Sequence, residues 1–507
     1  MTTTLERDRT SPAAAVPAPD PQRFRALWVI AVAQLMVVLD ASVVIIALPS
    51  AQQSLHISVA NRQWMLTAYT LSFGGLLLLG GRIADYLGRK RTFIVSLLGF
   101  AAASALGGLA QNAATLFSAR ALQGAFAAVM APAALSLLTV AFHEPRERAR
   151  AFAVYGGIAG AGAAVGLILG GVLTEYASWR WTLLVNVPIA IAAALGAVRY
   201  VTESKSSARH GYDIPGAVAV TLGLLALVYG FTTAGTDGWG SATTLELFGA
   251  AALLLASFVL IELRTAHPLL PLRVILDRDR GGSFLTSLLV GVALLGTFLS
   301  LTFYFQGTLH YSAMRTGLAF IPFSLGIVVG AAASGRLMPR LGPRRIMTVG
   351  IAMAAVGLWL FTLLTLHSSF VSIALPAELV VSVGMGMTFV PMNSTALTGV
   401  SPEDAGVASA LVNTTQQTGS AMGAALINTI ASTATASYLV SQGGARSALA
   451  AAAVHGYTTA FTFSAVVMVL AGVAAFALVR RTRLEANGEV LPATLPTARR
   501  SLARIDP

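Results

Sequence analysis

The chain has 507 residues, enough for roughly three or four soluble domains of about 150 residues each. Its composition excludes that arrangement, because 56% of the residues are hydrophobic and only 11% are charged, against roughly 25% charged in soluble proteins. The formal net charge is +12 and there is no cysteine, which excludes disulfides, thiolate metal sites and cysteine nucleophiles. The composition therefore predicts an integral membrane protein.

Fourteen apolar stretches are long enough to cross a bilayer core, which requires about 20 residues of helix. In chain order they cover residues 26–48, 63–81, 92–111, 114–140, 151–173, 181–201, 214–234, 244–263, 283–305, 317–338, 346–366, 370–394, 405–431 and 457–479. The stretch 405–431 is the weakest, because it carries four side-chain amides. The predicted fold is all-α, with 14 transmembrane helices.

The basic residues support this count. Lysine and arginine gather in cytoplasmic loops, and an even number of spans places 28 of the 33 basic residues on one side together with both tails. A thirteen-span alternative would leave Arg480, Arg481 and Arg483 outside. We therefore predict cytoplasmic tails at 1–25 and 481–507 of a multi-pass protein in a bacterial cell membrane. The positive charge then reflects membrane topology, and no nucleic-acid partner is expected.

An internal repeat divides the chain into two halves. Residues 81–91 and 335–345 share two glycines, an arginine and a basic ending at a constant offset of 254 residues. The repeat follows the second and the tenth span, so it predicts six-helix bundles at 26–201 and 281–480. The linker 202–280 then carries two additional transmembrane helices. Two related bundles around a central cavity are typical of alternating-access transporters.

Several motifs extend this interpretation to a family. Residues 81–91 resemble the signature loop of the major facilitator superfamily, and residues 39–49 resemble the first-helix signature of its fourteen-helix drug:proton antiporters. Residues 116–124 match the fourth-helix motif L-x-x-x-R-x-x-Q-G, and residues 179–188 are similar to the family's W-R-W and N-V-P stretch. The resemblance implies the major facilitator fold and proton-coupled transport.

The fifth span departs from the antiporter signature at one position. Four glycines are in register, but Leu167 replaces the usual proline, which removes the kink that a proline imposes. The glycines offer a groove for close helix contact and a seal between the halves, with plain packing as the alternative. They are Gly162, Gly166, Gly170 and Gly171.

Only three charged residues lie well inside the predicted spans: Asp40, Arg120 and Glu378. Charges inside a membrane are costly and usually functional. Asp40 and Arg120 fall at similar depth, so they can pair, and a movement that separates them would change the proton affinity of Asp40. We predict Asp40 as the proton carrier and Arg120 as its modulator, in agreement with the role that the resemblance implies for the arginine. A purely structural pair is the alternative.

Further candidates lie in the second half of the chain. Glu378 is a possible site for a cationic substrate or a second proton, or a residue near the membrane interface. Asn413, Gln416 and Gln417 share one helix face and could contact substrate or bond between helices. Met385 and Phe389 could form an adaptable pocket, although ordinary packing is the more frequent role. Span 283–305 ends in aromatic residues, for which an interfacial belt is the default.

The loop after the second span is a candidate cytoplasmic latch. Its glycines permit a tight turn, and its carboxylate could bond a helix N-terminus or an arginine across the bundle. The predicted latch residues are Gly81, Asp85, Gly88, Arg89 and Lys90.

The predicted function is proton-coupled export of amphipathic drugs, antibiotics or toxic metabolites by alternating access. The expected partners are protons, the small-molecule substrate and the bilayer, the chain is expected to be a monomer, and no cofactor is expected. A transporter of one defined metabolite, such as an amino acid, sugar or siderophore, is the alternative. A membrane enzyme is disfavoured, because the seven histidines form no ligand-spaced pair and no catalytic or metal site is recognisable.

Overall fold

A computed structural model of the chain describes residues 22–59, 61–142, 144–204, 213–265, 268, 270, 272–400, 405–480, 483–484 and 490–491. Helices dominate these ranges. The only strands in the described ranges are β1 (Arg483–Leu484) and β2 (Val490–Leu491), which pair antiparallel with Arg483 opposite Leu491. The all-α prediction is confirmed.

The helices of the first part of the chain are α1 (Arg23–Ser54), α2 (Trp64–Leu87), α3 (Arg89–Gly108), α4 (Ala113–Ala141), α5 (Pro145–Tyr176), α6 (Trp181–Leu184), α7 (Asn186–Tyr200), α8 (Ile214–Asp237) and α9 (Ala242–Arg264). The later ones are α10 (Leu272–Leu276), α11 (Arg278–Phe303), η1 (Tyr304–Thr308), α12 (Ala313–Ala319), α13 (Ile321–Leu341), α14 (Pro343–Phe361), η2 (Phe370–Ala374), α15 (Leu375–Leu397), α16 (Ala405–Ser441), η3 (Arg446–Ala448) and α17 (Leu449–Leu478). The segments η1 and η2 are π-helices, and η3 is a 3₁₀-helix.

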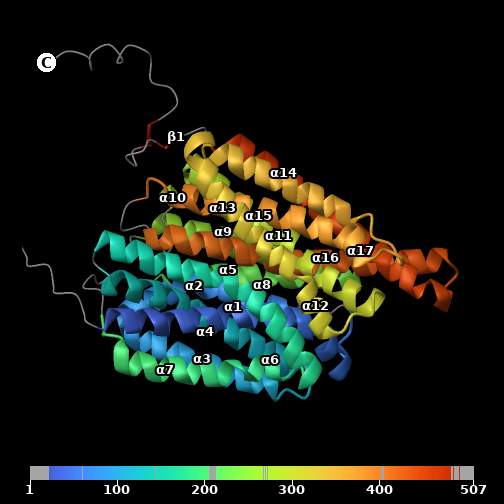
Figure 1. The fold of residues 1–507 in the computed structure, drawn as a ribbon, viewed down its shortest axis with the longest axis horizontal. Coiled ribbons are helices and arrows are strands. Elements are labelled where there is room, and N and C mark those ends of the chain that lie inside the picture. The colour runs from blue at the N-terminus through green and yellow to red at the C-terminus, as the bar shows by residue number, and fades with distance from the viewer. Residues whose placement is uncertain are drawn as a thin grey trace, which may run out of the picture.

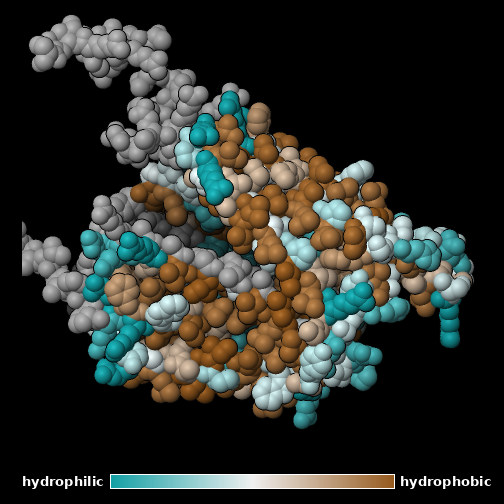
Figure 2. All heavy atoms as spheres, in the orientation of Figure 1, coloured by the Kyte–Doolittle hydropathy of each residue, from teal (hydrophilic) through white to brown (hydrophobic). Residues whose placement is uncertain are grey.

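Eleven helical segments in the described residues are long and apolar enough to cross a membrane. The three other predicted positions are occupied by the helices α2, α5 and α16. The arrangement is therefore compatible with fourteen spans, and that number stays a prediction. Figure 2 shows hydrophobic side chains over the helices, whereas hydrophilic ones gather at the two ends of the molecule.

The two copies of the sequence repeat form equivalent turns. Gly88 ends α2 and precedes α3 with a φ of 101°, and Gly342 ends α13 and precedes α14 with a φ of 76°. A positive φ of this size is readily adopted only by glycine. Both turns therefore need glycine for their backbone geometry.

Helices α1–α7 pack together below, in blue to green, and α11 and α13–α17 pack together above, in yellow to red, while α12 lies against α5 (Figure 1). Helix α8 contacts α2 and α16, and α9 packs on α8. The two groups meet mainly where α2 contacts α16 and where α5 contacts α12. We call the end of the molecule where α1 begins and α17 ends the tail end, and the opposite end the far end. The boundaries predicted for the two bundles and the linker stay a prediction.

Candidate functional site

A buried ion pair joins α1 to α4. Arg120 Nη1 donates to Asp40 Oδ2 at 2.6 Å, and both side chains are completely buried. Arg120 Nε also donates to the backbone oxygen of Met65 at 2.9 Å, and the guanidinium lies 4.5 Å from the centre of the Tyr69 ring. Arg120 is thus held by a carboxylate, a backbone carbonyl of α2 and an aromatic face.

Two amides complete the coordination of Asp40. Gln123 Nε2 donates to Asp40 Oδ1 at 2.9 Å, and Asn186 Nδ2 donates to the same oxygen at 2.7 Å. Gln123 Oε1 accepts from Arg120 Nη1 at 2.9 Å, so the glutamine contacts both charges. The carboxylate therefore has three side-chain donors from α4 and α7. This satisfies most of the hydrogen-bonding capacity of an ionised carboxylate.

Close contact between α2 and α4 brings this network together. A side-chain carbon at Gly124 would collide with the backbone oxygen of Tyr69, and one at Gly80 would collide with the backbone of Ala128. Glycine at both positions lets the helix backbones approach, as small residues do in membrane bundles. Arg120, one turn from Gly124, can then reach the carbonyl of Met65 on α2.

Sequence reasoning identified the two charges of this site and missed the amides as ligands. Gln123 lies three residues after Arg120, a spacing that places both on one helix face. Asn186 begins α7 and is far from the other members in sequence. The sequence indicated only that it belongs to a family motif. The role of Asp40 and Arg120 in proton coupling stays a prediction.

The α5 glycine motif contacts two different partners. An added side-chain carbon at Gly162 would lie 3.1 Å from Val38, one at Gly166 would lie 2.7 Å from Ser42, and one at Gly170 would lie 2.8 Å from a backbone oxygen of α1. At Gly171 the nearest atom is instead the Cα of Met314 on α12, at 2.7 Å. Three glycines thus pack α5 on α1, and the fourth lies at the contact with the other half.

The latch motif surrounds the turn at Gly88. The Glu203 carboxylate accepts from the backbone nitrogens of Lys90 at 3.0 Å and Arg91 at 3.1 Å. Lys90 Nζ donates to the Val198 oxygen at 2.9 Å, and the Arg89 nitrogen donates to the Ser204 oxygen at 3.1 Å. A carboxylate therefore does bond a helix N-terminus here, but sequence reasoning missed Glu203.

The other two predicted latch residues are Gly81 and Asp85. Gly81 is partly buried in α2, and the side chain of Asp85 lies outside the described residues.

The candidates in the second half are not hydrogen-bonded to the Asp40 network in the described residues. Glu378 and Met385 are completely buried in α15, and Phe389 is partly buried. On α16, Asn413 is exposed while Gln416 and Gln417 are partly buried. The side chain of Gln417 lies against α2, since a carbon added at Gly74 would be 3.0 Å from its Cβ.

The expected aromatic belt after α11 is wrong for two residues. Tyr304 and Phe305 are completely buried in η1, and the Tyr304 hydroxyl donates to the Thr365 oxygen at 2.8 Å. The ring of Phe305 lies 5.6 Å from that of Phe320 and 5.8 Å from that of Phe370. The π-helix turns these rings into the protein interior, where they pack with each other.

A far-end cluster links the two halves. Arg62 Nε donates to Asn428 Oδ1 at 2.9 Å, and Asn428 Nδ2 donates to Gln63 Oε1 at 3.0 Å. Nearby, Gln306 Nε2 donates to the Ile46 oxygen at 3.1 Å. Bonds from Met314 to Glu175 and from Tyr176 to Met314 join α12 to α5 toward the same end.

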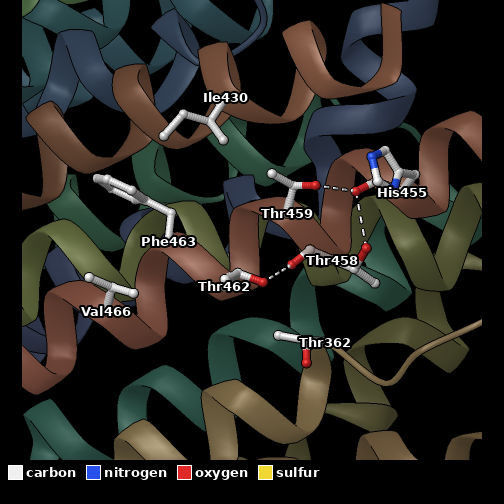
Figure 3. Close-up of a pocket in the computed structure, with 8 residues that line it drawn as sticks. All are labelled: Thr362, Ile430, His455, Thr458, Thr459, Thr462, Phe463 and Val466. Atoms are coloured by element: carbon white, nitrogen blue, oxygen red, sulfur yellow. Dashed lines mark hydrogen bonds between the residues drawn. The ribbon is translucent and has the colours of Figure 1, made fainter. Parts of the chain in front are cut away.

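A separate pocket of about 620 Å³ lies between α14, α16 and α17 (Figure 3). Thr458 and Thr459 both donate to the backbone oxygen of His455 there, at 3.0 and 2.8 Å, and Thr462 donates to the Thr458 oxygen at 2.9 Å. These threonine hydroxyls are therefore occupied by their own helix. The pocket includes none of the residues predicted from the sequence.

Comparison with known proteins agrees with this fold. The profile of the Major Facilitator Superfamily matches residues 30–424. The chain belongs to that superfamily. It is therefore a multi-pass membrane transporter and not an enzyme.

Its relatives include antibiotic resistance and export proteins. The chain is 47% identical to the puromycin resistance protein pur8 of Streptomyces alboniger, over 96% of this chain and 97% of the relative. It is 40% identical to the cephamycin export protein CmcT of Amycolatopsis lactamdurans, over 81% and 85%. The solved structure of an inward-facing bacterial homologue of the human lysosomal transporter Spinster has a TM-score of 0.63. That structure is 16% identical and covers 90% of this chain and 97% of its own, so it supports the fold alone.

Proposed function

We propose that this transporter exports an amphipathic antibiotic or toxic metabolite from the cytoplasm in exchange for protons. The observation that carries the proposal is the completely buried pair of Asp40 and Arg120. Two charges in the membrane interior have a large desolvation cost, so such residues are retained mainly where they have a function. The names of the relatives support an antibiotic as the class of substrate.

The proton step follows from the surroundings of Asp40. Its carboxylate accepts from Arg120, Gln123 and Asn186. Protonation removes the attraction to Arg120, whose guanidinium cannot lose its own proton. Arg120 then keeps only the Met65 carbonyl, the Gln123 oxygen and the Tyr69 ring. Binding and release of the proton therefore change what holds α1 to α4.

The far-end cluster indicates which side of the transporter is closed in this conformation. With Arg62, Gln63 and Asn428 bonded, the halves are joined at the far end. We place the tails in the cytoplasm, as the basic loops favour, so that the far end faces the outside. The conformation is then closed to the outside. Opening outward would break these bonds, and proton binding at Asp40 would accompany that change. Differential stabilisation of two states by a ligand is the general basis of such coupling.

Growth inhibition tests this proposal. A drug-sensitive bacterium with and without the chain is exposed to puromycin, a cephamycin and unrelated amphipathic drugs, each with and without an uncoupler. We expect resistance to at least one antibiotic, and we expect the uncoupler to abolish drug export measured directly in washed cells. Unchanged sensitivity to every compound, together with uptake of one amino acid, sugar or siderophore, would instead support the single-metabolite alternative.

A further inference from the structure

Glu378 is a buried carboxylate without a partner. It lies in the first turn of α15 and is completely buried. Neither Oε1 nor Oε2 has a hydrogen-bond partner within the described part of the chain. Asp40 is equally buried and accepts from three side chains. The two intramembrane acids therefore occupy opposite environments.

The helices around Glu378 supply no compensating charge. α15 packs against α11, α13, α14, α16 and η2. The described charged residues of these elements lie at the tail end of their helices, and they are Arg278, Asp279, Arg280, Arg336, Arg340, Arg344 and Arg345. That end is roughly 28 Å from Glu378 along α15, at 1.5 Å per residue.

Several other titratable groups lie on elements at the far end. The Tyr304 hydroxyl in η1 is bonded to the Thr365 oxygen. Tyr438 lies near the far end of α16, and the adjacent helix α17 contributes His455 and Tyr457 to the same end. Tyr457 is itself paired with Arg62. None of these groups is hydrogen-bonded to Glu378 in the described part of the chain.

An ionised carboxylate in such surroundings is strongly disfavoured, because nothing replaces the water that it loses. A protonated carboxyl carries no charge and tolerates the same surroundings far better. Glu378 also lies in the first turn of α15, which follows η2, and single π-helical turns within helices are frequent at functional sites. The same face of α15 carries Ser382 and Met385, at spacings of four and seven residues.

We propose that Glu378 is a second proton-binding site, placed in the half of the chain that lacks Asp40. It holds one proton in the conformation closed at the far end. It takes up this proton from water at the far end while that end is open, and it keeps the proton in the closed conformation. When helix movement admits water from the tail end, the proton leaves to that water and the carboxylate remains. One proton is bound and one is released in each cycle, so each cycle carries one proton across the membrane and needs no other reactant. Its part in transport rests on the proposed proton-coupled export.

Infrared spectroscopy tests the protonation directly. Purified protein at neutral pH, in lipid, should show the carbonyl-stretch band of a protonated carboxylic acid. Glu378→Gln should lose this band, Glu378→Asp should shift it, and Asp40→Asn should leave it unchanged, because the Asp40 carboxylate is paired with Arg120. Identical spectra for wild type and both Glu378 variants would overturn the proposal. The Asp variant keeps the test decisive if the Gln variant does not fold.

A transport measurement tests the second proton in the cycle. In proteoliposomes, the proton-to-substrate ratio is obtained from the pH gradient that just stops net transport. We expect Glu378→Gln to lower this ratio by one proton, or to abolish gradient-driven export while leaving substrate binding within about twofold. An unchanged ratio with full export contradicts a coupled second proton. If the wild type shows no proton dependence, the proposed function fails, and the infrared band still decides whether Glu378 holds a proton.

Discussion

Removing both charges of the buried pair should cost less than the sum of the two single removals. Asp40→Asn leaves Arg120 buried without its carboxylate, and breaking a buried ion pair in this way costs about 3–5 kcal/mol. Arg120→Gln should cost less, because a carboxylic acid can take a proton and become neutral whereas arginine cannot lose one. The double variant removes both charges. Its cost should therefore be about 1–3 kcal/mol smaller than the sum of the two single costs.

The assay for this comparison is the unfolding of purified protein in detergent. It is followed for wild type, Asp40→Asn, Arg120→Gln and the double variant. Additive costs, or an Asp40→Asn variant as stable as wild type, would refute the account. The 2.6 Å contact between the two residues would then carry no net interaction.

Three other substitutions have defined outcomes. The carbon added by Gly166→Ala would lie 2.7 Å from a side-chain carbon of α1, whereas the carbon added by Gly249→Ala would have no neighbour within 4 Å. Thermal unfolding should show that Gly166→Ala lowers stability by about 1–3 kcal/mol. Gly249→Ala should show no such cost. Asn428→Ala removes three hydrogen bonds at the far end and should favour opening there by about 1–3 kcal/mol. Longer distances between spin labels across that end would show this opening, and unchanged distances would contradict it. The labels can be attached specifically to introduced cysteines, because the chain has no cysteine of its own. A hydrogen bond from Arg23 of α1 lowers the pKa of Glu147. The stability that this bond adds to the folded protein is therefore present above the ordinary carboxyl pKa of about 4.3. It is lost as the pH falls through the lowered pKa. Glu147→Gln should therefore reduce the melting temperature at neutral pH and not in strong acid, whereas Glu144→Gln should reduce it at neither; a pH-independent effect would refute this origin.

The order of the helices was predictable because each apolar stretch must cover a bilayer thickness, but the helix ends were not. α1 continues to Ser54 and α16 to Ser441, beyond the predicted ends at 48 and 431. Outside the hydrocarbon region a helix needs no apolar composition, so hydropathy does not locate its end. Helix packing and hydrogen bonds determine these extensions instead.

The site was predictable only to the level of its charges. The cost of charge in a membrane singled out Asp40 and Arg120, and their similar depth indicated that they could meet. The rotation of each helix about its axis decides which neighbours point at them, and neither hydropathy nor spacing fixes that rotation. For this reason Asn186 was missed as a ligand of Asp40. Glu203, which bonds the start of α3, was missed because only the folded chain brings it there.

Drug-driven proton movement tests the central claim most directly. Inverted membrane vesicles containing the chain are loaded with a pH-sensitive dye and energised, and an antibiotic from the growth panel is then added. The account predicts that the drug dissipates the pH gradient with wild type and that Asp40→Asn abolishes both this response and drug accumulation. Full gradient-driven accumulation by folded Asp40→Asn would contradict it.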